Sequence, residues 1–420
     1  MDSIVINGPT RLKGSVKISG AKNSILPIMA ATVMAKTPFI LRNVPNVSDV
    51  RSMVSLLKAL GAKVEFRGSV LKIDPKNIHS SVADYDYVKT MRASICLLGP
   101  LLARFNKASI SMPGGCVIGL RPIDLHLKGL KKLGAKITLE HGYVNVHTKG
   151  LVGQQIYLGG AFGSSVLATA NIMMAASRAK GKTTIVSAAC EPEVVDLGHF
   201  LIKMGAKIEG LGSPVITITG VKQLKGCEYS IISDRIEAGT YILAAAITRG
   251  DVVIQNAPIL QLGAVIDELK QAGVGITVKG KQIHVKYIGA LKPMTLTTHT
   301  YPGFPTDLQA QMMALLAVIP GISVLTEKIF PDRFMHVAEL GRMGALIRLE
   351  GPSAIIEGVS KLSAAPVMAS DLRASAALII AGLASKGETE ISRVYHLDRG
   401  YEKLEEKLRG LGAKIKRIKS

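Results

Sequence analysis

The phrase Leu60-Gly61-Ala62-Lys63-Val64 returns along the chain at nearly even intervals and decides the fold. Its glycine recurs at positions 134, 205, 273, 344 and 412, so that the steps are 73, 71, 68, 71 and 68 residues. A period of this size is typical of a chain assembled from copies of one supersecondary unit. The sequence therefore predicts six units of about 70 residues each.

Each unit contains two kinds of helix. An amphipathic helix, such as 50–60 or 125–133, precedes the phrase, and the glycine is expected to end it in a left-handed conformation. Alternating residues then predict strands, of which the hairpin 136–140 and 143–147 is the clearest. The second helix is apolar on all sides and should be buried. These apolar helices are predicted over 23–35, 92–102, 166–177, 238–248, 308–318 and 373–385.

Six such units predict two α/β globes. Three units packed around a common axis would bury three apolar helices behind a wall of sheets. We expect the first globe over 22–229 and the second over 1–21 plus 230–420, with the N-terminal strand 4–6 completing the second globe. A ligand is expected in the cleft between the globes, which is a favoured place for binding sites.

Length and composition exclude several classes of protein. The chain has 420 residues, of which 48% are hydrophobic, and disordered chains carry fewer. Its longest nearly apolar runs, 312–325 and 374–385, are shorter than the roughly 20 residues of a membrane span. The start of the chain lacks the pattern of a secretory signal. Four cysteines without C-x-x-C spacing predict a reducing, cytoplasmic environment.

The charge of the chain is strongly positive. Lys and Arg number 52 against 31 Asp and Glu, for a net charge of +21. This excess suits an anionic partner, which could be nucleic acid, acidic lipid or a phosphorylated small molecule. With ten Tyr, eight Phe and no Trp, the chain has few side chains on which single-stranded bases could stack. Solubility alone is an equally good interpretation of much of this charge.

One loop holds a candidate reactive cysteine. Residues 113–122 read PGGCVIGLRP, so that Cys116 lies close to Arg121 among glycines and prolines. Positive charge near a thiol lowers its pKa and activates it. The alternative is a surface turn with an incidental cysteine. Cys96 stands among Ile95 and Leu97 and is expected to pack in the core.

Other candidates stand where loops meet the apolar helices. Lys22 lies at a helix start, where free backbone N–H groups favour an anion, although a solvated lysine beside an asparagine cap is the alternative. Asp307 also precedes a helix and could be its N-cap. Arg373 and Arg399 lie at similar junctions, and arginine binds phosphate and carboxylate through bidentate contacts. The sequence has no metal-binding spacing or dinucleotide fingerprint, so no metal or cofactor is expected.

Six segments together resemble the UDP-N-acetylglucosamine 1-carboxyvinyltransferase family of the EPSP synthase superfamily. They are Gly20–Asn23, 113–122, Phe304–Gln311, Arg333–His336, Asp371–Ala376 and His396–Glu402. The resemblance runs nearly from end to end. It implies an enolpyruvyl transferase fold, in which two inside-out α/β globes each contain three βαβαββ units.

The resemblance also implies an activity. The enolpyruvyl group of phosphoenolpyruvate would be transferred to the 3′-hydroxyl of UDP-N-acetylglucosamine by addition and elimination, with release of phosphate. This is the first committed step of bacterial peptidoglycan synthesis, and the epoxide fosfomycin inhibits the family. The resemblance implies a cytoplasmic enzyme that acts on two small molecules, with no cofactor, nucleic acid, membrane span or obligate protein partner.

Residue roles follow from the same resemblance. The implied catalytic residues are the acid Cys116, the base Asp307 and Lys22. Phosphoenolpyruvate would be bound by Lys22, Asn23, Arg121 and Arg399. Contacts with the nucleotide sugar are implied for Asn23, Arg92, Arg121, Pro122, Ile123, Asp124, Leu125, Ser165, Val166, Asp307 and Ile329. Arg333, Asp371 and Arg373 match family positions at the cleft without an assigned role.

One departure and two alternatives remain. Leu167 stands where the family commonly has glycine, which adds a side chain at a helix start near the uridine site. An enzyme acting on shikimate 3-phosphate would share the fold, although the cysteine loop and the segment Phe304–Asp307 favour the nucleotide-sugar enzyme. A basic two-domain protein that binds nucleic acid would use the +21 charge without catalysis.

Overall fold

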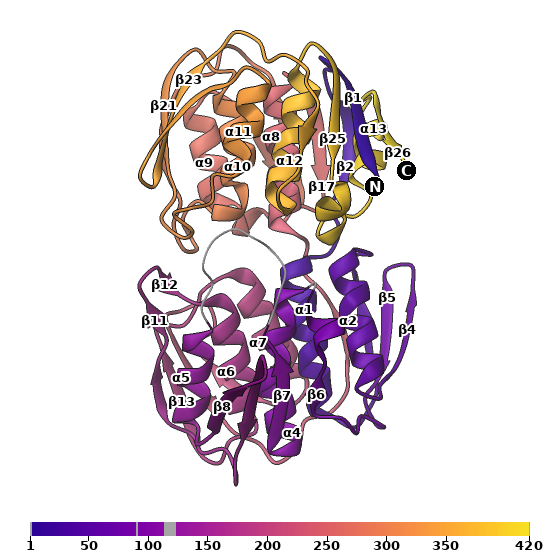
Figure 1. The fold of residues 1–420 in the computed structure, drawn as a ribbon, viewed down its shortest axis with the longest axis vertical. Helices are drawn as coiled ribbons and strands as arrows, with labels where there is room; N and C mark the ends of the chain where they lie inside the picture. Colours follow the sequence, from indigo (N-terminus) through magenta and orange to yellow (C-terminus); the bar gives the residue numbers. More distant parts are fainter. Residues whose placement is uncertain (1, 90, 113–122, 420) are drawn as a thin grey trace. The chain divides into compact units, whose positions relative to one another are not determined.

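The structure, a computed structural model, describes residues 2–89, 91–112 and 123–419 (Figure 1). These residues form two compact units. The N-terminal unit comprises the described residues from Gly20 to Ile232, and the C-terminal unit comprises those of 1–19 and 233–420. Each unit has its own hydrophobic core.

Three four-stranded sheets surround the core of the N-terminal unit. Their strand orders are β16-β3-β5-β4, β6-β7-β9-β8 and β10-β13-β15-β14, and a small pair β11-β12 is added. The strands are β3 (Phe39–Arg42), β4 (Lys63–Arg67), β5 (Val70–Asp74), β6 (Val82–Ala83), β7 (Lys107–Ser111), β8 (Lys136–Glu140), β9 (Tyr143–His147), β10 (Gln155–Tyr157), β11 (Gly159–Gly160), β12 (Gly163–Ser164), β13 (Lys182–Val186), β14 (Lys207–Glu209), β15 (Val215–Thr219) and β16 (Glu228–Ser230).

The C-terminal unit has three sheets of the same kind. Their orders are β18-β19-β17-β2, β20-β21-β23-β22 and β24-β25-β1-β26. The strands are β1 (Ser3–Gly8), β2 (Lys13–Lys17), β17 (Asp251–Gln255), β18 (Gly275–Lys279), β19 (Gln282–Lys286), β20 (Thr295–Thr297), β21 (Gly321–Thr326), β22 (Leu346–Glu350), β23 (Ser353–Gly358), β24 (Val367–Met368), β25 (Gly387–Ser392) and β26 (Ile415–Ile418).

One plan is repeated in all six of these sheets. A short edge strand pairs in parallel with the first strand of a repeat, as β6 does with β7. That strand pairs antiparallel with the last strand of the repeat, which forms a hairpin with the middle one. In the sixth sheet β1 takes the place of the last strand and pairs with both β25 and β26. The strand expected over 4–6 is thus part of β1, in the C-terminal unit.

The amphipathic helices end as the repeated phrase predicts. They are α2 (Ser48–Ala59), α5 (Asp124–Lys132), α7 (Pro192–Lys203), α9 (Gly263–Gln271), α11 (His336–Arg342) and α13 (Leu404–Gly410). The phrase glycine stands two residues after the last residue of each helix, and at all six positions its φ lies between 86° and 107°. Residues with a side chain rarely adopt this left-handed backbone conformation, which explains why glycine recurs there.

The apolar helices lie inside each unit, behind the sheets (Figure 1). They are α1 (Lys22–Ala31), α4 (Leu98–Phe105), α6 (Val166–Ala176), α8 (Arg235–Ile247), α10 (Gln309–Leu316) and α12 (Leu372–Ala384). In the C-terminal unit α8, α10 and α12 pack on one another. The α/β fold with buried apolar helices is therefore confirmed. None of the helices among the described residues is long and apolar enough to cross a membrane.

Three of the apolar helices differ from the prediction, and the one predicted over 23–35 is α1 followed by the 3₁₀ helix η1 (Thr32–Met34). The segment predicted as one helix over 92–102 is a 3₁₀ helix, η2 (Arg92–Leu97), followed by α4. Pro100 has no N–H to donate and costs no hydrogen bond in the first turn of an α-helix, and α4 begins two residues before it. The segment 308–318 likewise divides into the 3₁₀ helix η4 (Thr306–Leu308) and α10.

Two neighbouring glycines test the role of the repeated phrase. Gly412 has a φ of 92°, whereas Gly410 is the last residue of α13, and an added Cβ would meet no atom within 4 Å at either position. We predict that Gly412→Ala lowers the free energy of unfolding by about 1–2 kcal/mol, because the left-handed backbone strains alanine. The control Gly410→Ala should leave stability unchanged or raise it by up to about 1 kcal/mol. Urea unfolding of the whole chain measures both, and equal effects would contradict the assignment.

Candidate functional site

The predicted site residues fall into two groups, which are described unit by unit. Those in the N-terminal unit are Lys22, Asn23, Arg92, Ile123, Asp124, Leu125, Ser165 and Val166. Those in the C-terminal unit are Asp307, Ile329, Arg333, Asp371, Arg373 and Arg399. Cys116, Arg121 and Pro122 lie outside the described residues.

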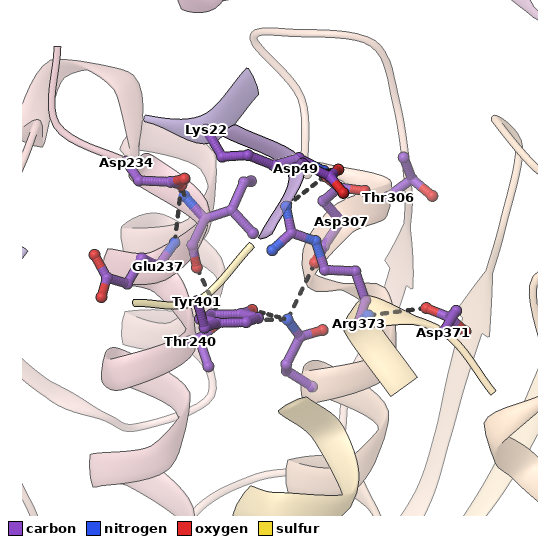
Figure 2. A network of polar contacts seen from close by, with 12 residues as sticks. Lys22, Asp49, Asp234, Glu237, Thr240, Thr306, Asp307, Asp371, Arg373 and Tyr401 are labelled. Carbon is purple, nitrogen blue, oxygen red and sulfur yellow. Dashed lines mark hydrogen bonds and ion pairs between the residues drawn. The ribbon is translucent and has the colours of Figure 1, made fainter. Parts of the chain in front are cut away.

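Asp307 is held between two arginines in the C-terminal unit. Arg333 Nη1 lies 2.9 Å from Asp307 Oδ1. Arg373 Nη2 lies 2.9 Å from Asp307 Oδ2 (Figure 2). The side chains of Arg333 and Arg373 are 6% and 5% exposed, while that of Asp307 is 25% exposed. Asp307 lies within η4, and its carboxylate caps no helix. The alternative role as an N-cap is therefore wrong.

The two arginines decide the charge state of Asp307. Burial would raise its pKa, but the positive charges of Arg373 and Arg333 outweigh burial and hold the pKa well below the usual range. Burial likewise opposes the charge of Arg373, yet the facing carboxylate raises the pKa of Arg373 above its usual value. The cluster of one carboxylate and two guanidiniums therefore carries a net positive charge, which suits an anionic ligand.

Arg373 is oriented by its own helix and by an aromatic ring. It lies in the first turn of α12, whose N-cap Asp371 accepts hydrogen bonds from Arg373 N at 2.8 Å and Ala374 N at 3.2 Å. Asp371 thus has a capping role. The guanidinium also lies over the ring of Tyr401, 5.4 Å from its centroid. The Tyr401 hydroxyl is held in turn by Thr240 Oγ1 at 2.8 Å and by Gln311 Nε2 at 3.1 Å.

Arg333 is positioned from the other side of Asp307. Its Nη1 also donates to Thr306 Oγ1 at 3.0 Å, and its guanidinium lies 5.9 Å from the centroid of the Phe330 ring. Ile329, which precedes Phe330, donates its backbone N–H to Glu327 Oε1 at 2.7 Å. The structure therefore brings Asp307, Ile329, Arg333 and Arg373 together.

Arg399 lies in the 3₁₀ helix η5 (Val394–Arg399), two residues before Tyr401. It shares its surroundings with His396 and Asp371. Burial lowers the pKa of His396, and the charge of Arg399 lowers it further, while Asp371 acts in the opposite direction. Arg399 is thereby associated with the start of α12, where Arg373 is also found.

Lys22 opens α1 in the N-terminal unit and is engaged by a carboxylate. Its Nζ lies 2.8 Å from Oδ2 of Asp49, in the first turn of α2, and the two side chains are 12% and 5% exposed. The residue that caps α1 is Ala21, which offers no side-chain hydrogen bond. Lys22 is thus neither freely solvated nor beside an asparagine cap. A cation at a helix N-terminus remains a suitable place for an anion.

A buried carboxylate fixes the first turn of α1. Asp196, on α7, accepts hydrogen bonds from Ser24 Oγ and, at 2.6 Å, from the Tyr229 hydroxyl. Burial raises the pKa of Asp196, and these hydrogen bonds oppose the rise. Because Ser24 follows Lys22 and Asn23 directly, Asp196 anchors the helix turn that carries both residues. Sequence reasoning missed it, since 172 residues separate Asp196 from Ser24.

A buried set of hydrogen bonds around Asn171, called the node below, joins the segments predicted to contact a nucleotide sugar. Asn171, on α6, accepts from Gly99 N at 2.6 Å and donates to Ile95 O at 2.9 Å and His126 Nδ1 at 3.0 Å. Burial, with a contribution from the charge of Arg92, lowers the pKa of His126 to about 3, so this ring is neutral. The node connects η2, which begins at Arg92, and α4 with the first turn of α5 and the middle of α6.

The remaining predicted residues lie at these helix starts. Asp124 and Leu125 open α5, directly after Ile123. Ser165 caps α6, and its hydroxyl accepts from Ala168 N at 3.3 Å, while Val166 is the first residue of that helix. No group of three or more His, Cys, Asp or Glu residues suited to a metal ion occurs within 2–89, 91–112 and 123–419.

Comparison of the sequence with known proteins assigns the chain to a family. The family model described as EPSP synthase (3-phosphoshikimate 1-carboxyvinyltransferase) matches residues 6–408. The chain is 52% identical over 420 residues to the UDP-N-acetylglucosamine 1-carboxyvinyltransferase of Methylacidiphilum infernorum and 52% identical over 418 residues to that of Geotalea daltonii. Both alignments cover 100% of this chain and 100% of the relative.

Solved structures agree on the fold. The enolpyruvyl transferase NikO from Streptomyces tendae matches with a TM-score of 0.90 at 24% identity, over 100% of this chain and 99% of that chain. EPSP synthase from Acinetobacter baumannii matches with a TM-score of 0.76 at 21% identity, over 100% of both chains. The six-repeat architecture, the family model and the full-length relatives lead to one conclusion: the chain belongs to the EPSP synthase family.

Proposed function

We propose that this chain transfers the enolpyruvyl group of phosphoenolpyruvate to the 3′-hydroxyl of UDP-N-acetylglucosamine, with release of phosphate. The observation that carries the proposal is the 52% identity, over the full length, to proteins named for this reaction. The partly exposed carboxylate between two buried arginines supports it, because the reaction needs a proton acceptor and a site for anions. This reaction begins peptidoglycan synthesis, and we propose a cytoplasmic location.

The chemistry is an addition followed by an elimination. The sugar hydroxyl attacks C2 of phosphoenolpyruvate and loses its proton, while C3 gains one. The tetrahedral intermediate then loses phosphate together with a proton from C3. The enzyme therefore has to supply a proton acceptor, a proton donor and cations that stabilise the phosphate and carboxylate groups.

Asp307 is the proposed proton acceptor. Its lowered pKa keeps it ionised at neutral pH, so it can accept a hydrogen bond from the sugar hydroxyl at any time. A carboxylate with a low pKa is also a weak base. We therefore propose that Asp307 takes the proton late, when the bond from oxygen to C2 is forming and the hydroxyl has become acidic.

The other roles are proposed from the family resemblance. Lys22 also counts among the catalytic residues, Cys116 would donate the proton, and Lys22, Asn23, Arg121 and Arg399 would bind phosphoenolpyruvate. The segment 121–125 would contact the nucleotide sugar together with Asn23, Arg92, Ser165, Val166, Asp307 and Ile329. The node at Asn171 supports this assignment, because it ties three of these segments to one another.

The second candidate is the reaction with shikimate 3-phosphate, because the family model carries that name. Phosphate release from phosphoenolpyruvate distinguishes the two. We predict multiple turnovers with UDP-N-acetylglucosamine and no release above background with shikimate 3-phosphate. Turnover with shikimate 3-phosphate alone would transfer the assignment to the second candidate. Absence of turnover with both acceptors would contradict enolpyruvyl transfer.

The charge of Arg373 is predicted to set the pH dependence of the reaction. Arg373→Gln removes one of the two cations that lower the pKa of Asp307, so this pKa rises and the carboxylate becomes protonated at a higher pH. The acid limb of the kcat/KM profile should therefore move up by about one pH unit or more. The control Arg342→Gln alters a 57% exposed side chain on α11 and should leave the limb in place. If the acid limb of the kcat/KM profile of Arg373→Gln lies at the same pH as in the parent, Asp307 is not the titrating base.

Alkylation by fosfomycin tests the cysteine assignment. We predict a single modified residue, Cys116, because an anion-binding site would guide the phosphonate of the inhibitor to this thiol. Cys96 serves as the internal control, since it is fully buried and burial raises its pKa to about 12. Cys116→Asp should escape modification. Peptide mapping by mass spectrometry identifies the site, and a label on Cys96, Cys190 or Cys227 would refute the assignment.

A further inference from the structure

Glu327 is a fully buried carboxylate that none of the sequence motifs singled out. It follows β21 directly, at the end where the neighbouring parallel strand β20 leads into Thr298. Oε1 accepts from Thr298 Oγ1 at 2.7 Å, Ile329 N at 2.7 Å and Phe330 N at 3.1 Å. Oε2 accepts from Thr306 Oγ1 at 2.8 Å. Each of these four partners is a hydrogen-bond donor, which suits an ionised carboxylate.

The direction of the hydrogen bonds between Glu327 and the hydroxyls of Thr298 and Thr306 is determined by the other partners of these hydroxyls. A threonine hydroxyl has one proton to donate. Thr298 Oγ1 accepts from Lys328 N at 3.0 Å, and Thr306 Oγ1 accepts from Arg333 Nη1 at 3.0 Å. Neither Lys328 N nor Arg333 Nη1 can accept a proton, so both hydroxyls must donate theirs to Glu327. The lone pairs of Thr306 consequently face Arg333.

This direction has a consequence at Asp307. Nη1 of Arg333 is shared between Thr306 Oγ1 and Asp307 Oδ1, at 3.0 and 2.9 Å. Glu327 also fixes the turn from which Arg333 projects, because it binds Ile329 N and Phe330 N, and Phe330 O accepts from Arg333 N at 2.9 Å. Glu327 thus holds Arg333 at both ends, through its backbone turn and through the hydroxyl that its guanidinium contacts.

We propose that Glu327 is a positioning residue for the transfer reaction: its charge directs the Thr306 hydroxyl so that Arg333 is held against the Asp307 carboxylate. The inference rests on the proposed function for its effect on turnover. Its effect on the geometry around Asp307 is independent of the substrate. A purely structural role for Glu327 would depend on its shape and its ties to the backbone, and not on the direction of one hydroxyl bond.

Glu327→Gln separates these two roles. The glutamine oxygen must face the fixed donors Ile329 N and Phe330 N, so its NH₂ group faces Thr306 and donates to it. The Thr306 proton then has no acceptor at residue 327 and turns toward Arg333 and Asp307. The shape and the backbone ties of residue 327 are kept, while the direction of one hydrogen bond is reversed. We expect kcat to fall about tenfold or more, because misplacement of the catalytic groups is costly.

The first readout is a kinetic cycle with Thr306→Val, which removes the hydroxyl at nearly constant volume. Because Glu327 acts through this hydroxyl, Glu327→Gln should lower kcat in the parent but have little further effect in Thr306→Val. The Kd for UDP-N-acetylglucosamine should change less than threefold in Glu327→Gln, since the Ile329 turn is kept. The control Glu350→Gln alters a 58% exposed side chain on β22 and should change none of these values. Independent, multiplicative effects on kcat would overturn the proposal.

The second readout needs no substrate. Isotope-edited infrared spectroscopy of protein labelled with ¹³C-aspartate, with Asp307→Asn subtracted, isolates the carboxylate band of Asp307. We expect this band to move in Glu327→Gln and in Thr306→Val, but not in Glu350→Gln. A band that stays in place in a folded Glu327→Gln or Thr306→Val protein would overturn the proposal, whatever substrate the enzyme uses. Absence of turnover by the parent chain would instead count against the proposed function alone.

Discussion

The site depends on one pair of salt bridges, in which the partly exposed Asp307 lies between the buried Arg333 and Arg373. Buried charges are costly unless they are paired, and removal of one partner leaves an uncompensated charge. Here each carboxylate oxygen meets one guanidinium, so the three side chains fix one another's positions. The surplus of one positive charge leaves the cluster able to attract an anion. The chemistry proposed for the chain, which brings an anionic substrate to a hydroxyl, needs both properties.

The repeat architecture explains how Asp307 and Arg373 meet. Each repeat places one apolar helix in the interior of its unit, and the chain enters that helix from a loop at one end. Asp307 comes from the entry to α10 and Arg373 from the entry to α12, and these two helices pack on each other. The same rule applies in the N-terminal unit, where Lys22 opens α1 and Ser165 caps α6. A duplicated scaffold thus supplies several helix starts, and the side chains at those starts differ from repeat to repeat.

Much of the scaffold was predictable because its signals are local. Gly61 and its five counterparts adopt the expected left-handed conformation, and the hairpin of β8 and β9 has the predicted bounds. The site was less accessible to sequence reasoning because its partners are distant in the chain. Its position before a helix left Asp307 open to a capping role, whereas its partner Arg373 lies 66 residues away in the chain. The surroundings of Lys22 depend on its ion pair with Asp49, which lies on another helix. The positioning role of Glu327 depends on its contact with Thr306, 21 residues away. The role of Cys116 stays a prediction.

A crystal structure of the chain with UDP-N-acetylglucosamine bound would show whether Asp307 is placed to receive the proton of the sugar hydroxyl. We expect the 3′-hydroxyl oxygen to lie within about 2.6–3.2 Å of an Asp307 carboxylate oxygen. We also expect Arg333 and Arg373 to keep their contacts with that carboxylate. A bound sugar whose 3′-hydroxyl faces another side chain, with Asp307 contacting only the two arginines, would rule out Asp307 as the proton acceptor.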